Sequence, residues 1–396
     1  MANKTITAPK GFVAAGVSCG IKRSRRPDLG MIYCPGGATA AGVFTTNRIV
    51  SPAVEVCRGH LTGGRIRAVV VNSGNANACT GAQGRRDALA MCGAAAGQSG
   101  CAAENVLVAS TGIIGERLPV RKITAGIENA GRKLSASASA GTAFARSIMT
   151  TDTRHKQAVR DLVISGRKAF VAGAVKGLGM ISPNMATTLM FITTDVSISK
   201  SLLARAMKEA VGSSLNKLTV DGHQSTNDTA LILASASAGN RRISKVTSSG
   251  YKRFHKALTD LCGELARKTA LDAEGAARIF RVEVKNAANA HDARLAARAV
   301  ADYDLVKCAV HGKDPNWGRI ICAVGSCGAE LDPDRLSCRI GGVSVFRNGR
   351  PVKFDPRAVR RIMSRKEHTI TVSLGAGRAE DFCYGCELSR QYVKIN

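Results

Sequence analysis

The chain has 396 residues, enough for one large domain or for two to three of ordinary size. Hydrophobic residues make up 45% of it and aromatic residues only 4%, which predicts a core of closely packed small and aliphatic side chains. No run of 18 apolar residues occurs, so we expect no transmembrane helix. The apolar patch near the N-terminus is too short and too broken by glycine for a secretory signal. We therefore expect a soluble, cytoplasmic protein.

The formal net charge of +28 points first to nucleic acid as a partner. The basic residues are scattered along the chain, however, and only residues 22–26 form a real cluster. Proteins that bind single-stranded nucleic acid need stacking aromatic residues, which make up only 4% of this chain. No zinc finger, RNP or helix-turn-helix signature is present. An anionic substrate or a solvated basic surface explains the charge equally well. We expect no nucleic-acid partner, and a basic nucleic-acid-binding protein remains the alternative outside the enzymes.

The thirteen cysteines are odd in number and irregular in spacing. One Cys-x-x-Cys pair, Cys383 and Cys386, has no second pair that would complete a zinc site. In a chain without a secretory signal we expect reduced thiols in the core. We predict no bound metal.

The first half of the chain mixes strands with helices. Residues 65–81 and 104–119 each have the composition of a strand that runs into a loop of small polar residues. One helical face is indicated by apolar residues at spacings of four, three and four, namely Ile123, Ile127, Ala130 and Leu134. The segment that follows, SASASAGT at 135–142, has the composition of a surface connection.

The second half begins with two predicted strands, 168–177 and 188–195, on either side of a Gly/Pro-containing loop. Two more helical stripes follow, Leu202, Leu203, Ala206, Met207, Ala210 and Val211, and then Phe254, Leu258, Leu261 and Leu265. Residues 279–285 alternate apolar with charged side chains, which predicts a half-buried strand. Because no βαβ unit repeats, we predict a layered α+β fold. A change of pattern after about residue 270 predicts a smaller C-terminal α/β domain, residues 270–396.

Most familiar catalytic motifs are absent. The chain has no Walker A loop, no dinucleotide fingerprint and no Gly-x-Ser-x-Gly elbow, and its seven histidines pair with no evident nucleophile. A threonine at a new N-terminus needs no histidine, because its own α-amine, with a pKa of about 7.7 to 8.0, is a base at neutral pH.

The segment KGLGMISPNMATTLMFITTD, residues 176–195, offers such a threonine. Small Ala186 precedes Thr187, between a turn with glycine and proline and a buried strand. A strained turn next to an anchored strand would hold the Ala186–Thr187 bond ready for scission. On this local pattern alone, the ordinary interpretation of Thr187 and Thr188 as β-branched strand residues is favoured.

Seven segments, taken together, change that balance. They are VVVNSGNANACTG, STGIIGERLP, IMTTDT, KGLGMISPNMATTLMFITTD, VDGHQSTNDT, DPNWGRI and the final YVKIN. Through them the sequence resembles the ornithine acetyltransferase family of arginine biosynthesis, the glutamate N-acetyltransferases, which are bifunctional in some members. The resemblance runs over nearly the whole chain. Each segment alone is weak evidence, but seven in the family order are strong evidence.

The resemblance implies a fold of the self-cleaving N-terminal-threonine acyltransferase type. It implies that the chain cuts itself between Ala186 and Thr187 into fragments 1–186 and 187–396. The Thr187 hydroxyl would then carry an acetyl group from N2-acetyl-L-ornithine to L-glutamate, with Thr111 and Gly112 as the oxyanion hole. The resemblance also implies no cofactor, acetyl-CoA as a co-substrate only in a bifunctional member, and a heterotetramer of two copies of each fragment.

The resemblance assigns substrate contacts as well. Lys176 matches a lysine that contacts substrate, and either Thr150 or Thr151 matches a threonine that does so. Glu274 matches a glutamate that holds the substrate amine, although by its sequence context it is equally suited to the first turn of a helix. Asn396 matches an asparagine that also meets substrate, and relatives usually continue beyond it with a short tail. The rival among enzymes is an N-terminal-nucleophile amidase or aminopeptidase, in which water replaces glutamate.

Overall fold

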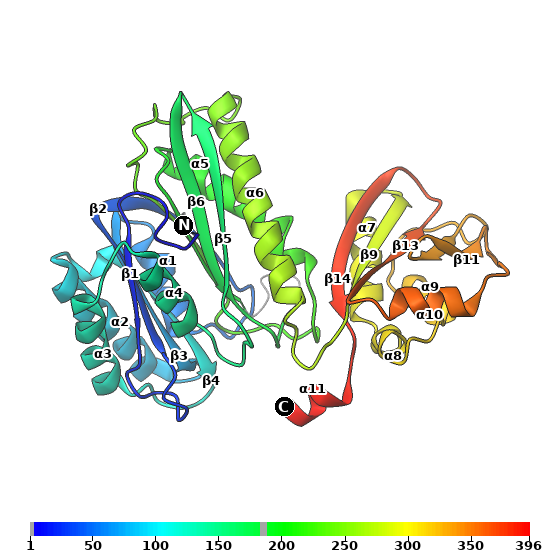
Figure 1. Ribbon diagram of the computed structural model, residues 1–396, viewed down its shortest axis with the longest axis horizontal. Coiled ribbons are helices and arrows are strands. Elements are labelled where there is room, and N and C mark those ends of the chain that lie inside the picture. The colour runs from blue at the N-terminus through cyan, green and yellow to red at the C-terminus, as the bar shows by residue number, and fades with distance from the viewer. Residues whose placement is uncertain (1–3, 183–187) are drawn as a thin grey trace. The chain divides into compact units, whose positions relative to one another are not determined.

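The computed structural model describes residues 4–182 and 188–396 (Figure 1). The chain forms two compact units. The first comprises Met1–Gly177, Asn184–Asn216 and Gln224–Thr269, and the second comprises Leu178–Pro183, Lys217–His223 and Ala270–Asn396. Across the described residues, every helix is too short or too polar to span a bilayer. These units are defined by how the chain packs, and packing does not show where a chain is cut. Cleavage into fragments 1–186 and 187–396 therefore stays a prediction.

The first unit is built on a sheet that has eight strands in the described part of the chain, in the order β4-β3-β2-β8-β7-β6-β5, with β1 paired to β2. The strands are β1 Val13–Val17, β2 Leu29–Phe44, β3 Ile66–Asn75, β4 Val106–Ile113, β5 Lys156–Ile164, β6 Arg167–Lys176, β7 Leu189–Thr194 and β8 Thr229–Ala234. The long strand β2 pairs with β3 through its first part and with β8 through residues 39–44, after a register shift between Tyr33 and Ala38. Pairs β3/β4 and β7/β8 are parallel and the other pairs are antiparallel.

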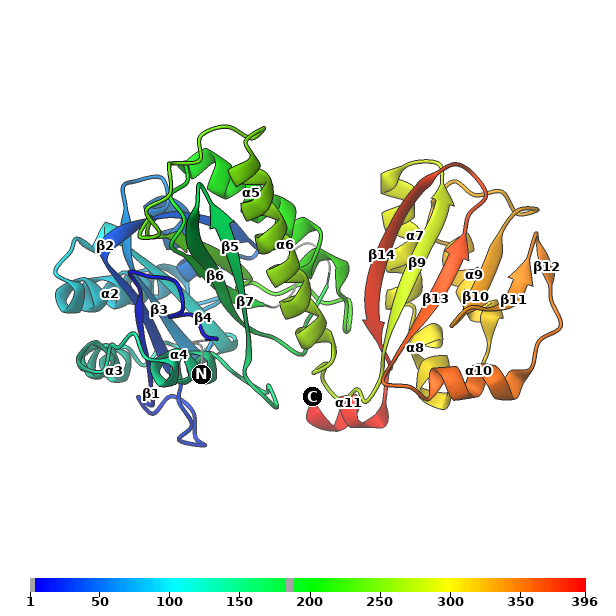
Figure 2. The ribbon, with the colours of Figure 1, turned by 45° about the horizontal axis from the view of Figure 1, so that its top comes forward.

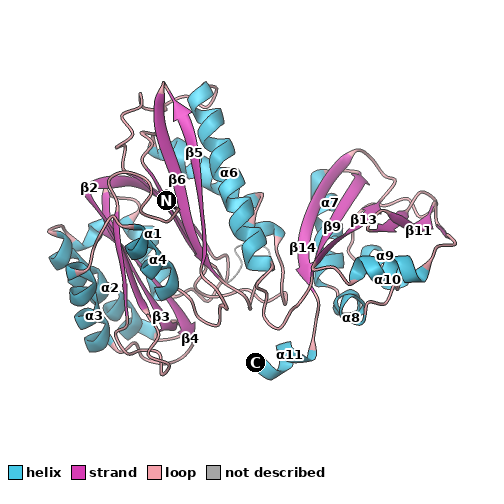
Figure 3. Cartoon of the chain, in the orientation of Figure 1, coloured by secondary structure: helices cyan, strands magenta, loops and turns pink. Residues whose placement is uncertain are grey.

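The helices of the first unit cover this sheet in layers (Figure 3). They are α1 Pro52–His60, α2 Gly81–Ser99, α3 Val120–Arg132, α4 Ala138–Ser147, α5 Lys200–Gly212 and α6 Ser249–Ala270, with short 3-10 helices at Ala103–Asn105 and Leu215–Lys217. Strand β7 shows why two cores form. Phe191 packs in one core, its ring edge-on to Phe144 of α4 at 5.5 Å, while Met190 and Ile192 pack in the other with α5 and α6. The predicted layered α+β class is confirmed.

The segment 135–142 differs from its prediction as a connection, because α4 begins inside it at Ala138. Ser137 is the N-cap, and its Oγ accepts a hydrogen bond from the Ala140 N–H at 3.2 Å. A Cβ on Gly141 would lie 2.1 Å from Thr5 Oγ1. The small residues therefore serve close packing, and that requirement comes from a distant part of the chain.

The second unit is built on a sheet that has six strands in the described part, in the order β12-β11-β10-β13-β9-β14 (Figure 2). The strands are β9 Ile279–Ala287, β10 Ser337–Ile340, β11 Val343–Arg347, β12 Arg350–Pro351, β13 Glu367–Ser373 and β14 Ala379–Cys386; the helices are α7 Ala290–Asp302, α8 Asp304–Gly312, α9 Trp317–Gly325, α10 Pro356–Met363 and α11 Arg390–Ile395. On β9, Phe280, Val282 and Val284 are buried in the core that α7 also enters. The alternate residues point to the other face of the sheet, which carries polar side chains.

Candidate functional site

A buried hydroxyl–ammonium pair joins two strands of the first unit. Thr111 lies near the end of β4, and Lys176 is the last residue of β6, 65 positions further along the chain. The Lys176 ammonium donates to Thr111 Oγ1 at 2.7 Å, and the two residues are only 3% and 5% exposed. A hydroxyl that accepts from an ammonium keeps its own hydrogen for another acceptor. The pair therefore presents one oriented O–H donor.

Gly112 follows Thr111 in a conformation that a side chain would not allow. Its φ is +138°, and a Cβ on it would lie 2.2 Å from the carbonyl carbon of Gly74 on β3. Glycine is required here because two parallel strands approach each other at their ends. The neighbouring loop is held by buried amides, since Asn72 Nδ2 donates to Asn75 O at 2.8 Å and Asn227 Nδ2 donates to Ala76 O at 2.6 Å.

A buried carboxylate fixes the backbone that follows Lys176. Asp152 Oδ1 accepts from the Lys156 ammonium and from the Gly177 N–H, the latter at 3.0 Å. Burial by itself raises the pKa of Asp152, but the charges of Lys156 and Lys176 and the Gly177 N–H outweigh burial and hold the pKa below its usual range. Asp152 is therefore a full negative charge. Sequence reasoning missed it, although it lies within the segment IMTTDT that was singled out for its threonines.

Thr150 and Thr151 both line a hollow of about 680 Å³ in the first unit. The Thr150 N–H donates to Asp152 Oδ2 at 2.9 Å. Thr150 is half-buried, whereas Thr151 is exposed. Lys22 lines the same hollow and donates to Met149 O at 2.6 Å. Burial lowers the pKa of Lys22 to about 8, against the attraction of Asp28 and Asp152. Both threonines therefore lie in the wall of this hollow, and their contact with substrate stays a prediction.

Ala186 and Thr187, the predicted cleavage site, lie outside the described residues. On the C-terminal side, Thr188 is 1% exposed, and its N–H donates to Asp228 Oδ1 at 3.1 Å. Burial raises the pKa of Asp228 well above its usual value, although the Thr188 N–H and the charge of Lys176 lower it. Neither Thr188 Oγ1 nor Asp228 Oδ2 has a hydrogen-bond partner among the described residues.

On the N-terminal side, the segment is held by a carboxylate of the second unit. The N–H groups of Met180 and Ile181 donate to Asp221 at 2.6 and 2.9 Å, and the Tyr392 hydroxyl donates to it at 3.0 Å. Arg298 donates to Ser182 Oγ at 2.9 Å. Each flank of the predicted cleavage site is therefore tied to a carboxylate through its backbone.

Glu274 and Asn396 meet within the second unit. Asn396 Nδ2 donates to Glu274 Oε2 at 3.4 Å, and the Glu274 N–H donates to Leu178 O at 2.9 Å. Glu274 is 9% exposed and Asn396 is exposed. Glu274 lies in the turn after α6, so its interpretation as a charge in the first turn of a helix is wrong. The structure thus pairs Thr111 with Lys176 in one unit and Glu274 with Asn396 in the other.

A metal site is not evident in residues 4–182 and 188–396, where no group of three or more histidine, cysteine, aspartate or glutamate side chains could hold an ion. Cys383 and Cys386 are free and buried on β14. Burial raises the pKa of Cys386 to about 12, which disfavours the thiolate that binds metal.

Comparison with known proteins gives a consistent result. The sequence model of the ArgJ family matches residues 13–396. A protein of Symbiobacterium thermophilum named "Arginine biosynthesis bifunctional protein ArgJ" is 46% identical over 393 residues, which cover 99% of this chain and 97% of the relative. Its namesake from Thermotoga neapolitana is 43% identical over 396 residues, which cover 98% of each. The solved structure of argJ from Bacillus halodurans is 35% identical with a TM-score of 0.51, and the match covers 52% of this chain and 97% of that one.

Proposed function

Because this chain belongs to the ArgJ family, we propose that it transfers an acetyl group from N2-acetyl-L-ornithine to L-glutamate through an acetyl ester on Thr187. The match over nearly the whole chain confirms the resemblance inferred from the sequence, and with it the prediction of an acetyltransferase of arginine biosynthesis. The observation that carries the mechanism is the buried contact of Lys176 with Thr111. It aims a hydroxyl hydrogen from the end of β4, as an oxyanion hole requires.

The first step is self-cleavage. The Thr187 hydroxyl attacks the Ala186 carbonyl, the C–N bond breaks, and an ester replaces the peptide bond. Water then hydrolyses the ester, leaving a carboxylate on Ala186 and a free amine on Thr187. Support comes from the tethers at Asp221 and Asp228, which hold the two flanks of this bond. Further support comes from the Bacillus halodurans structure, because a chain matched over 97% of its length covers only 52% of this one, as expected of a fragment from a chain cut near its middle.

Acetyl transfer follows in two halves. The Thr187 amine takes the proton from its own hydroxyl, and the oxygen attacks the acetyl carbonyl. The Thr111 hydroxyl and the Gly112 N–H stabilise the tetrahedral oxyanion, and one such donor is typically worth about 3 to 4 kcal/mol. Ornithine leaves with the proton on its amine. The amine of glutamate then attacks the ester carbonyl, the acyl C–O bond to Thr187 breaks, and the Thr187 oxygen takes back a proton. Acetylglutamate leaves, so the kinetics are ping-pong.

The remaining roles belong to the same proposal. Lys176, and Thr150 or Thr151, contact the substrate. Glu274 holds the substrate amine, and Asn396 also meets the substrate. The relatives are named bifunctional, and we assign the second activity to acetyl-CoA as an alternative acetyl donor, with no cofactor. The active form is a heterotetramer of two 1–186 and two 187–396 fragments, in the cytoplasm.

The test uses Thr187→Ala with Thr188→Ser as the matched control. Wild type and the control should run as two fragments on a denaturing gel, whereas Thr187→Ala should keep the intact mass of 41.4 kDa. Incubation with N2-acetyl-L-ornithine labelled in the acetyl group should label Thr187 alone, and glutamate should remove the label as acetylglutamate. Two bands from Thr187→Ala, or a label on another residue, would refute the proposal. Release of free acetate without glutamate would favour the amidase.

A further inference from the structure

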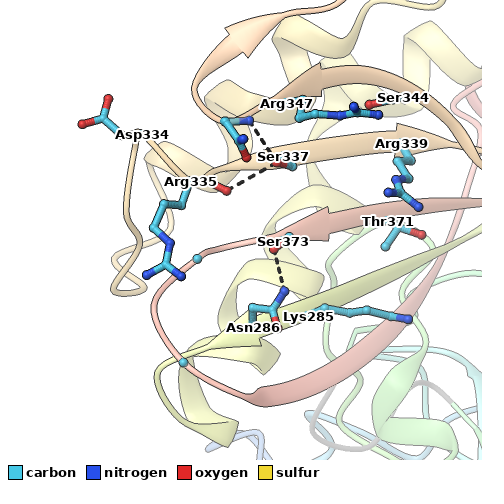
Figure 4. Close-up of a pocket in the computed structure, with 13 residues that line it drawn as sticks. Lys285, Asn286, Asp334, Arg335, Ser337, Arg339, Ser344, Arg347, Thr371 and Ser373 are labelled. Atoms are coloured by element: carbon cyan, nitrogen blue, oxygen red, sulfur yellow. Dashed lines mark hydrogen bonds between the residues drawn. The ribbon is translucent and has the colours of Figure 1, made fainter.

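The outward face of the second-unit sheet contains a hollow of about 700 Å³ (Figure 4). Strands β9, β10, β11 and β13 supply its floor. Cys338 and Ile340 of β10, like Ile370 and Val372 of β13, point into the core. The residues between them therefore point outward by the two-residue period of a strand, and they line the hollow.

The hollow has a strong excess of positive charge. Lys285, Arg335, Arg339 and Arg347 line it, and Asp334 is the carboxylate that accompanies them. None of these four cations forms an ion pair with any residue in 4–182 or 188–396, whereas neighbouring Arg281 is paired with Glu283 at 2.9 Å. Four cations and one carboxylate line the hollow, so it carries an excess of three positive charges.

Strand register places hydrogen-bond donors among these cations. Arg339 lies opposite Thr371 on one side and opposite Ser344 on the other. The Thr371 and Ser344 hydroxyls have no hydrogen-bond partner in the part of the chain that the structure describes. A guanidinium between two free hydroxyls offers a row of donors on rigid strands, which is a suitable floor for an anion with several oxygens.

Two other hydroxyls hold the rim in place. Ser337 Oγ donates to Arg335 O at 3.3 Å and accepts from the Asn348 N–H at 3.1 Å. Ser373 Oγ accepts from Asn286 Nδ2 at 2.8 Å, and these contacts are the dashed lines of Figure 4. The contacts fix the backbone that carries Arg335, Arg347 and Lys285. Ordering the rim in advance lowers the entropy cost of binding a ligand there.

We propose that this hollow binds the diphosphate or triphosphate group of a small molecule. A ligand with one carboxylate would leave most of the positive charge uncompensated, whereas a diphosphate balances it. No aromatic or large aliphatic side chain lines the hollow, which disfavours an apolar ligand and the base stacking by which single-stranded nucleic acid is held. The volume of about 700 Å³ lies within the range of small-molecule sites. The inference stands apart from the proposed acetyl transfer.

The experiment is calorimetric titration of the full protein with inorganic pyrophosphate at constant ionic strength. The test variant is Arg339→Ala/Arg347→Ala. The matched control is Arg357→Ala/Arg360→Ala, which removes the same charge from exposed residues of α10 in the same unit. Wild type and the control should bind equally, and the test variant at least about ten-fold more weakly, because two guanidinium forks are lost. Hydrogen exchange at 334–348 and 371–377 should slow with pyrophosphate in wild type.

Two further arms identify the source of the phosphates. ADP binding more tightly than pyrophosphate through the same two arginines indicates a nucleotide, and equal affinity indicates free diphosphate. The proposal is overturned if wild type fails to bind pyrophosphate at about 1 mM, which corresponds to roughly 4 kcal/mol. It is overturned equally if both double variants lose the same affinity. Binding of a single-stranded oligonucleotide through these arginines without binding of pyrophosphate would also refute it. Melting curves without ligand check that each variant is folded.

Discussion

Replacing Asp152 with asparagine tests the buried charge pair that supports the site. The side chains of Asp152 and Lys156 are 0% and 1% exposed. Asparagine keeps the shape of aspartate and can still accept a hydrogen bond, but it removes the negative charge that Asp152 sets against the Lys156 ammonium. Lys156 also donates to Gly177 O at 3.3 Å, and that acceptor is neutral. We expect Asp152→Asn to lower the free energy of unfolding at pH 7 by about 3 to 5 kcal/mol.

The dependence on pH has a definite sign. The pKa of Asp152 in the folded protein lies below its usual value of 3.8. Its stabilising effect is therefore complete above that value, and it is lost as the pH falls through the lower, folded pKa. The difference in stability between wild type and Asp152→Asn should be largest near neutral pH and should shrink below about pH 3.8.

The assay is urea denaturation followed by circular dichroism, at one protein concentration for all variants. Lys156→Met removes the other charge, and the double variant Asp152→Asn/Lys156→Met leaves no buried charge from this pair. A buried ion pair replaced on both sides is often nearly neutral, so the double variant should recover most of the stability. The reasoning is refuted if Asp152→Asn costs less than about 1 kcal/mol, the range of an exposed pair, or if the double variant is no better.

Three further predictions concern the site and the second unit. Lys176→Met should lower kcat of acetyl transfer roughly 10²-fold, because Thr111 loses the ammonium that orients its hydroxyl. Lys122→Met, which replaces an exposed lysine, is the control. A kcat for Lys176→Met within two-fold of wild type, roughly 0.4 kcal/mol, would contradict this role. Gly112→Ala should lower the free energy of unfolding by about 2 kcal/mol or more, because its Cβ would lie 2.2 Å from Gly74. Gly115→Ala, at φ +86° but with no atom within 4 Å of its Cβ, should lower it less. Equal losses of unfolding free energy in denaturant titrations would count against the clash. Burial and the charge of Arg278 lower the pKa of His368 from its usual 6.5 to about 4. Between pH 6.5 and pH 4, His368 therefore binds a proton in the unfolded chain but not in the folded chain. Stability should therefore fall by about 3 kcal/mol over that interval, and His368→Phe, which can stack on Phe280, should abolish this slope in melting curves recorded from pH 7 to pH 4.

Much of the secondary structure could be predicted because its signals are local. The stripes of apolar residues correspond to α3, α5 and α6, and the alternation at 279–285 corresponds to β9. The predicted strands 168–177 and 188–195 correspond to β6, Arg167–Lys176, and β7, Leu189–Thr194. Helix α4 was missed, because its small residues are explained by packing against the N-terminal segment, and no local pattern records that contact.

The candidate site divides in the same way. Thr111, Gly112, Lys176, Glu274 and Asn396 were predicted through resemblance in local segments, and their roles stay predictions. Asp152 as the anchor of Gly177, and Asp221 as the anchor of Met180 and Ile181, were not found. The residues beside a carboxylate in the sequence do not indicate which distant backbone N–H group will donate a hydrogen bond to it.

The sequence by itself determined the family, the periodic helices and strands, and the residue types available for acyl transfer, because these depend on neighbours along the chain. Only the tertiary structure decided which of those residues touch. Lys176 meets Thr111 across 65 positions, and strand register gathers Arg339, Thr371 and Ser344 on one outward face. Burial raises the pKa of both Asp152 and Asp228, but at Asp152 the charges of Lys156 and Lys176 and the Gly177 N–H outweigh burial and reverse the shift. The net direction therefore depends on what the whole fold packs around each carboxyl group.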